Sequence, residues 1–301
     1  MRPDENGACM RDRRHVVIAM LGASLAATGC NQAEVERLRL ISQEIDRALN
    51  ANQVLRAELN ALPAQASCPT PIQESRQLSD RDLVERLERA TVMVLVPQSR
   101  SGLGSGFFVG PNLILTNRHV VENAQDRKVL IVSRALQTVR QGSVVRVTMK
   151  DGVGGADFAL IRLDEGTGPG YLGFTGTVRK LDGVVAVGYP GLTVTGDRNF
   201  QRLLRGDIAA APDLNFTAGS VQAIQDGTNG LQHVLHTAQI SGGNSGGPLV
   251  DRCGRVVGVN TFIRVDTEQS ARANFALHAR AAIAFLLAAG LPVTSQTSDC
   301  A

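Results

Sequence analysis

Short apolar segments bounded by turn residues follow one another through residues 91–262, and this pattern limits the possible folds most strongly. No helical period separates these segments. Because parallel strands need long, usually helical connections, the pattern predicts a mainly β chain, folded as an antiparallel barrel or sandwich. The predicted strands are 91–96, 104–109, 113–117, 129–133, 144–149, 158–163, 183–188, 219–224, 231–238, 247–250 and 256–262.

Two helices flank this β region in the prediction. Ser79 precedes an amphipathic segment at 80–87 and is a suitable N-cap for a short helix. Residues 279–289 are apolar nearly all round and are followed by Gly290 and Pro292, which predicts a packed C-terminal helix.

The composition excludes several functional classes. A hydrophobic fraction of 43% over 301 residues is enough for a real core. The formal net charge is +3 and no Lys/Arg block is dense, so we expect no nucleic-acid partner. The sequence has no glycine-rich phosphate loop and no Cys/His set at metal-ligand spacing, so it predicts no cofactor and no metal.

The first 30 residues have the pattern of a secretory signal, with a basic group at 11–14, an apolar run at 16–27 and Cys30 at the end. Small residues ending on a cysteine resemble the lipobox of bacterial lipoproteins, which implies lipidation of Cys30. We therefore expect a lipid anchor in the bacterial cell envelope, facing the periplasm. A plain signal and a secreted protein are the alternative, and translation starts at either Met1 or Met10.

Residues 31–63 form a predicted helical stalk, because apolar side chains recur there at spacings of three and four. The seam runs from Leu38 to Leu62, and Pro63 ends it. Such a segment is either a coiled coil that makes a homo-oligomer or a lone amphipathic helix lying on the catalytic domain or the membrane. Residues 64–78 are rich in Pro, Ser and Gln and predict a linker, which leaves 79–301 as the globular domain.

The stretch 240–250 places Ser245 among four glycines, just before an apolar strand. Glycines permit a tight bend and a close approach to the main chain, as a nucleophilic serine and an oxyanion site require. A plain hairpin turn is the other interpretation. Two further polar residues stand at predicted strand edges, His119 and Asp157, and each alone is compatible with a structural role.

Together the segments 116–121, 157–161 and 243–248 resemble the three motifs of trypsin-like serine proteases, closest to the bacterial HtrA/Deg branch. The resemblance covers roughly residues 85–292 and implies a chymotrypsin fold, a double six-stranded antiparallel β-barrel. It also implies roles for five residues. Ser245 attacks the scissile carbonyl, His119 takes its proton and Asp157 orients the imidazole, while Gly243, Asn244 and Ser245 form the oxyanion hole.

Two departures from the family pattern matter. Asn244 stands where digestive trypsins have the aspartate that receives a new N-terminus, so the resemblance implies no activation by that ion pair. HtrA proteins usually carry a PDZ domain after the protease, and here the chain ends at Ala301, which implies a protease without that module.

Specificity and disulfide pairing are less constrained by the sequence. By position, the primary pocket is lined by Gln239, Ile240, Asn260, Thr261 and Phe262, which favours cleavage after small or medium aliphatic residues. The histidines at 233 and 236 are interpreted as structural or exposed, and the insertion 192–215 as a surface loop or a cover of the cleft. Three cysteines remain beyond the signal, at 68, 253 and 300, and their pairing stays open.

The sequence therefore predicts an exported serine endopeptidase that works through an acyl-enzyme on envelope or misfolded proteins. Its partners would be protein or peptide substrates and the membrane. Two alternatives stay open: a non-catalytic binding or scaffold protein on a protease fold, and a hydrolase of small esters.

Overall fold

The computed structural model describes residues 43, 76–97, 102–149, 155–203, 207–227, 230–266 and 271–300. All but residue 43 belong to the second of the two structural units of the chain, Gln65–Ala301. The predicted signal with Cys30, nearly all of the stalk, most of the linker and Cys68 lie outside the described residues. No helix within the described ranges is long and apolar enough to cross a membrane.

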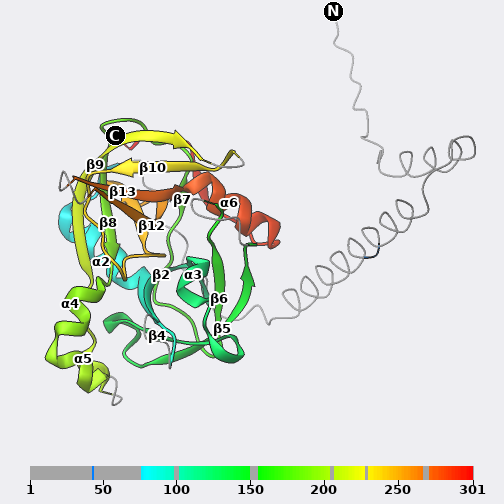
Figure 1. Cartoon of the computed structure of the whole chain (residues 1–301), viewed down its shortest axis with the longest axis vertical. Helices are drawn as coiled ribbons and strands as arrows, with labels where there is room; N and C mark the ends of the chain where they lie inside the picture. The colour runs from blue at the N-terminus through cyan, green and yellow to red at the C-terminus, as the bar shows by residue number, and fades with distance from the viewer. Residues whose placement is uncertain are drawn as a thin grey trace, which may run out of the picture. The chain divides into compact units, whose positions relative to one another are not determined.

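Six antiparallel strands close the first barrel in the order β1-β2-β3-β6-β5-β4. Their apolar side chains fill its interior, where Ile114, Ile131 and Ile161 are fully buried. Figure 1 shows this barrel as the cyan and green lower half of the domain. The strands are β1 (Thr91–Leu95), β2 (Leu103–Gly110), β3 (Leu113–Thr116), β4 (Lys128–Val132), β5 (Arg140–Val147) and β6 (Ala159–Leu163).

A second barrel follows in the order β11-β8-β9-β10-β13-β12, and a β11–β12 pairing closes it. Two short strands, β7 (Phe174–Thr175) and β14 (Ser295–Gln296), extend it by parallel pairing beside β12. The six closing strands are β8 (Gly183–Gly188), β9 (Asn215–Asp226), β10 (Gln232–His236), β11 (Pro248–Asp251), β12 (Val256–Asp266) and β13 (Ala271–His278). The predicted mainly β fold with two six-stranded antiparallel barrels is confirmed.

The helices lie at the ends and connections of the barrels (Figure 1). Both helices predicted to flank the β region are present, as α2 (Asp80–Ala90), which Ser79 caps, and α6 (Ala279–Ala288). The others are α3 (Arg118–Val121), α4 (Gly191–Gly196) and α5 (Arg198–Leu203), with the 3-10 turns η2 (Gln125–Arg127), η3 (Arg134–Leu136) and η4 (Ile208–Ala210).

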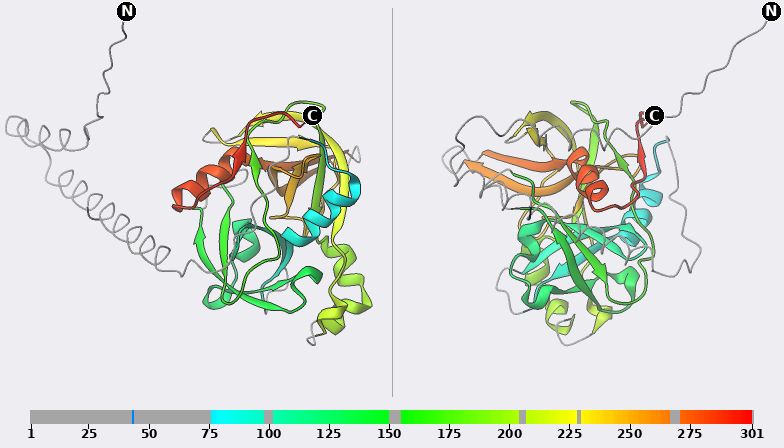
Figure 2. Two further views of the ribbon diagram at one scale, coloured as in Figure 1. Left: turned by 180° about the vertical axis from the view of Figure 1, so that it is seen from behind. Right: turned by 90° about the vertical axis from the view of Figure 1, so that its right-hand side faces the viewer.

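The insertion between β8 and β9 folds into α4, α5 and η4. Val194 and Leu203 of these helices are buried in one apolar cluster with Met93 of β1 and Val132 of β4. The insertion is therefore packed on the first barrel rather than being a free surface loop. Both views of Figure 2 show it, in yellow-green, beside that barrel.

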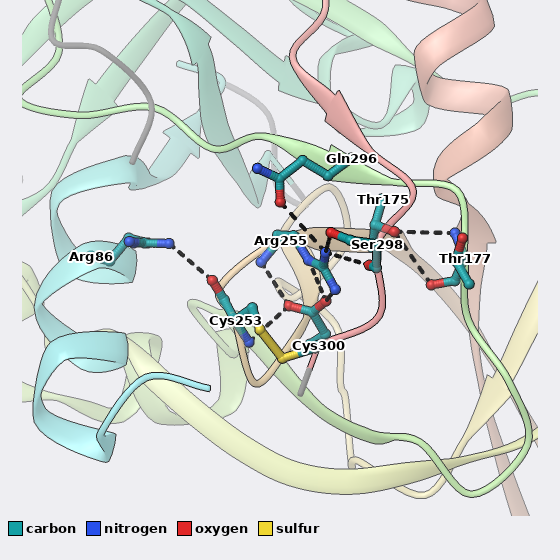
Figure 3. Close-up of a disulfide and its surroundings, with 9 residues drawn as sticks. Arg86, Thr175, Thr177, Cys253, Arg255, Gln296, Ser298 and Cys300 are labelled. Carbon is teal, nitrogen blue, oxygen red and sulfur yellow. Dashed lines mark hydrogen bonds and ion pairs between the residues drawn. A yellow bond between two sulfur atoms is a disulfide. The ribbon is translucent and has the colours of Figure 1, made fainter. Parts of the chain in front are cut away.

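One disulfide fastens the C-terminal tail to the turn between β11 and β12 (Figure 3). It joins Cys253 and Cys300, which the sequence alone did not pair. Beside it, Arg255 forms a buried ion pair with Asp251 at 2.7 Å and donates to the carbonyl oxygen of Ser298 at 2.8 Å. Arg86 of α2 donates to the carbonyl oxygen of Cys253 at 2.9 Å. The turn thus anchors both the tail and the first helix of the domain.

Candidate active site

His119 and Asp157 meet because the strands that carry them are paired. His119 lies on α3, directly after β3, and Asp157 lies just before β6, while Thr116 of β3 pairs with Ala159 of β6. The imidazole Nδ1 is 2.5 Å from Asp157 Oδ2, and the backbone amide of His119 donates to Asp157 Oδ1 at 3.0 Å. A carboxylate that accepts from Nδ1–H leaves Nε2 as the free acceptor of the ring.

Asp157 is held by further donors. The Thr261 hydroxyl donates to Asp157 Oδ2 at 3.2 Å, and the Asn117 side-chain amide donates to the Asp157 carbonyl oxygen at 2.7 Å. Burial by itself raises the pKa of Asp157, but the hydrogen bonds and charge of His119 and the charge of Arg118 outweigh it, so the pKa is lowered. The carboxylate is therefore ionised at neutral pH and can stabilise an imidazolium.

Ser245 reaches the same network through Thr261. It stands just before β11, and its hydroxyl donates to the Thr261 carbonyl oxygen at 3.1 Å. Among the described residues, no hydrogen bond joins the Ser245 hydroxyl to His119. Thr261 therefore contacts the serine with its carbonyl group and the aspartate with its hydroxyl.

A bulge in β12 explains how one residue can face both ways. The register of β12 against β13 shifts between Asn260 and Phe262, with Thr261 as the extra residue. A bulge turns the strand locally and redirects a side chain, and bulges are common beside active sites.

Among the described residues, the amide of Gly243 has no hydrogen-bond acceptor. The carbonyl oxygen of Gly242 accepts from Gly191 N at 2.6 Å, and in a trans peptide the N–H of the next residue points the opposite way. Gly243 has φ +95°, and a Cβ there would lie 2.4 Å from the Tyr189 carbonyl oxygen. Only glycine fits this position.

The amide of Ser245 is oriented in the same manner. The carbonyl oxygen of Asn244 accepts from Gly247 N at 3.0 Å, which fixes the peptide that carries Ser245 N–H. The amide of Asn244 donates to the Ser241 carbonyl oxygen at 3.0 Å, so it is not available to a ligand. Of the three residues predicted for the oxyanion hole, Gly243 and Ser245 thus have amides without an acceptor among the described residues, and Asn244 does not.

The residues predicted for the primary pocket are placed in different environments. Gln239 is exposed, whereas Ile240 is buried. Asn260 is fully buried and its side-chain amide donates to a backbone carbonyl oxygen, and Thr261 is engaged with the aspartate. Phe262 belongs to β12, and its side chain lies outside the described residues.

The structure adds Asn274 to this region. It lies on β13 opposite Ile263 of β12, is 4% exposed, and accepts from Ile240 N through Oδ1 at 3.3 Å. Its Nδ2 donates to the carbonyl oxygen of His236, so it links the predicted pocket walls to β10. No role for Asn274 was predicted from the sequence, since the segment around it shows no strand pattern, and neither was the contact between Thr261 and Asp157. His233 and His236 are both buried, which agrees with a structural interpretation.

Comparison with known proteins identifies the family. The trypsin-like peptidase domain matches residues 104–259, slightly more than half of the chain. The chain belongs to the trypsin-like peptidases. The match runs from β2 into the first part of β12 and includes Ser245, His119 and Asp157.

Individual proteins are also similar to parts of this chain. Protein y4bJ of Sinorhizobium fredii, which is uncharacterized, is 29% identical over 208 residues, covering 66% of this chain and 29% of that protein. The mitochondrial serine protease HTRA2 of Drosophila willistoni is 31% identical over 161 residues, covering 53% of this chain and 33% of that protein. The chain thus spans about a third of the length of the curated relatives it matches.

A solved structure is also similar in fold. The serine endoprotease from Yersinia pestis superposes with a TM-score of 0.52 at 24% identity, covering 70% of this chain and 66% of that one. The predicted resemblance to trypsin-like serine proteases, and to HtrA proteases among them, is confirmed by the family match and by the HTRA2 relative.

Proposed function

We propose that the chain is a serine endopeptidase in which Ser245 is the nucleophile, His119 the general base and Asp157 the residue that orients the imidazole. One observation carries this proposal. The ionised Asp157 is hydrogen-bonded to His119 on one side and to the Thr261 hydroxyl on the other, and the Thr261 carbonyl oxygen accepts from Ser245. A serine hydroxyl is a weak nucleophile until a positioned base takes its proton, and an imidazole with Nε2 free supplies that base.

The amides of Gly243 and Ser245 complete the chemistry. When the hydroxyl attacks a carbonyl carbon, the negative charge forms on the former carbonyl oxygen. The two free amides of residues 240–247, the nucleophile loop, can stabilise this charge. Loss of one such donor costs about 3–4 kcal/mol of transition-state stabilisation in serine proteases. The proton on His119 then passes to the leaving amine. Water next attacks the acyl carbon while His119 takes its proton, and that proton returns to the Ser245 oxygen as the ester bond breaks and the acid product leaves.

Substrate binding would release the serine from its contact with Thr261. Beyond Asn260, no described strand pairs with β12 on the side where β11 pairs, so this edge can bind an extended peptide by main-chain hydrogen bonds. When a substrate N–H donates to the Thr261 carbonyl oxygen, it takes the place of the Ser245 hydroxyl, which rotates away. Rotation about χ1 then directs the Ser245 hydroxyl to His119 Nε2.

The proposed substrates are envelope or misfolded proteins, and the proposed location is the periplasmic side of a bacterial membrane. These rest on the signal-like segment 1–30 and on the cysteine at position 30. The stalk at 31–63 is the candidate for self-association. Membrane fractionation of wild type and Cys30→Ser tests the anchor, since the variant should be released into the soluble fraction if lipid holds the protein.

The activity is tested with casein hydrolysis and with a fluorophosphonate probe that reacts with activated serines. Wild type should give both signals and Ser245→Ala should give neither. Ser241→Ala, in the same loop but outside the network, is the matched control and should keep both. A wild type that shows neither signal would support a non-catalytic scaffold protein, and cleavage of small esters without peptide cleavage would support an esterase.

A further inference from the structure

Ser105 of β2 is a fully buried serine that contacts the nucleophile loop, 138 residues away in the sequence. Its hydroxyl donates to the Gly243 carbonyl oxygen at 2.7 Å and accepts from the backbone amide of Tyr189 at 2.9 Å. Its own backbone amide donates to the Ser245 carbonyl oxygen at 2.9 Å. A single residue of the first barrel thus contacts three backbone groups of the second.

These contacts fix the peptide planes beside the two free amides. The hydroxyl bond orients the peptide that follows Gly243, and the amide bond orients the peptide that follows Ser245. The hydrogen bond from Tyr189 N to the Ser105 hydroxyl fixes the backbone just before Pro190 and Gly191. Gly191 N in turn donates to the Gly242 carbonyl oxygen and so orients the peptide that carries Gly243 N–H.

Ser105 is itself held firmly from the first barrel. The Thr116 hydroxyl of β3 donates to the Ser105 carbonyl oxygen at 2.6 Å. Two glycines make room for this arrangement. A Cβ at Gly246 would lie 2.3 Å from the Ser105 carbonyl oxygen, and a Cβ at Gly188 would lie 2.8 Å from the Ser105 hydroxyl oxygen. The loop and β8 therefore approach β2 closely enough for one hydroxyl to bridge them.

We propose that Ser105 is a positioning residue that holds the oxyanion-stabilising amides in place. This inference rests on the proposed function and deepens it. An ordinary buried serine would affect only the stability of the fold. A positioning serine affects the transition state more than the ground state, because the amides bind an oxygen that becomes charged only during the reaction.

The test compares three variants of the full chain. Ser105→Ala removes the bridge, and Ser105→Cys replaces it with a weaker donor of similar shape. Ser133→Ala is the matched control, because Ser133 is also a buried serine of the first barrel, 1% exposed, whose hydroxyl accepts from Leu136 N. The measurements are kcat and KM on a peptide amide, the inhibition constant of a peptide boronic acid, and the thermal midpoint.

We expect Ser105→Ala to lower kcat about tenfold or more while KM changes less than about threefold, and to weaken boronate binding by a similar factor. Ser105→Cys should fall between wild type and alanine. Ser133→Ala should keep kcat within about twofold of wild type, even where its thermal midpoint falls as far as that of Ser105→Ala. A Ser105→Ala variant that keeps kcat and boronate affinity, or a Ser133→Ala variant that loses them equally, would overturn the proposal.

Hydrogen exchange separates this proposal from the proposed function. The amides of Gly246 and Gly247 donate to Asn260 and Asn244, so they are protected while the loop is fixed. Faster exchange at both in Ser105→Ala, and not in Ser133→Ala, is expected whether or not the wild type hydrolyses peptides. Unchanged exchange would refute the positioning role, whereas an inactive wild type with this exchange pattern would refute only the proposed protease activity.

Discussion

Two buried histidines make the stability of the domain sensitive to mild acid. His236 on β10 is fully buried, and His278 at the start of α6 is 2% exposed. Burial lowers the pKa of each to about 4. The charge of Arg280 contributes at His278, and a backbone interaction with Ala238 acts more weakly in the opposite direction at His236.

The sign follows from where each ring is protonated. In the unfolded chain a histidine has a pKa of about 6.5, so it gains a proton as the pH falls through that value, while the buried ring stays neutral down to about pH 4. Stability is therefore fully present above about pH 6.5 and is lost progressively as the pH falls toward 4. From pH 7 to pH 5 the linkage relation gives a loss of about 2 kcal/mol for each histidine.

The assay is urea unfolding at pH 7 and at pH 5, at one salt concentration, with wild type and His236→Phe. Phenylalanine keeps a ring of similar size in an apolar site and removes the titrating group. The wild type should lose about 2 kcal/mol more than the variant between the two pH values. Equal losses in the two proteins would show that His236 does not resist protonation in the folded state, and the reasoning from burial would fail.

Three further variants test other contacts. Thr261→Val removes the hydroxyl that donates to Asp157 but keeps the shape, so kcat/KM on peptide amides should fall about tenfold, and an unchanged value would contradict the network. Gly243→Ala forces a Cβ to within 2.4 Å of a carbonyl oxygen at φ +95°, so hydrolysis should drop at least about 100-fold and an undiminished rate would contradict the predicted oxyanion site. Replacing Cys253 and Cys300 by serine opens a loop with a sequence separation of 47, and urea unfolding should show a loss of about 4 kcal/mol that disappears when both proteins are reduced.

A strand could be predicted from the sequence where its own residues show a clear apolar run with turn residues at both ends. The prediction for β8, Gly183–Gly188, matches the structure because an unbroken apolar run lies between two glycines. β13 was missed, since its first half, 271–274, alternates small and polar residues and becomes a strand only through pairing with β12. The two-residue strands β7 and β14 carry no pattern at all and exist only as parallel additions beside β12.

The site shows the same division between local and long-range information. Ser245, His119 and Asp157 stand in recognisable motifs, and the folding of β3 against β6 brings the last two together. The bulge at Thr261 could not be read from the sequence, because it is a feature of strand pairing rather than of residue type. The hydroxyl of Ser105 was equally hidden, because its partners lie in another barrel.

Asn244 explains why this arrangement of the loop does not depend on a charged partner. It is 6% exposed, and a carboxylate buried to that extent would need a cation beside it to offset the loss of hydration. The amide carries no charge, so its burial creates no such need. The orientation of the loop then rests on neutral hydrogen bonds, from Ser105 to the carbonyl oxygens of Gly243 and Ser245 and from Gly191 to that of Gly242. Since none of these donors is a chain terminus, the free amides of the nucleophile loop can be in place without cleavage of the chain to create a new N-terminus.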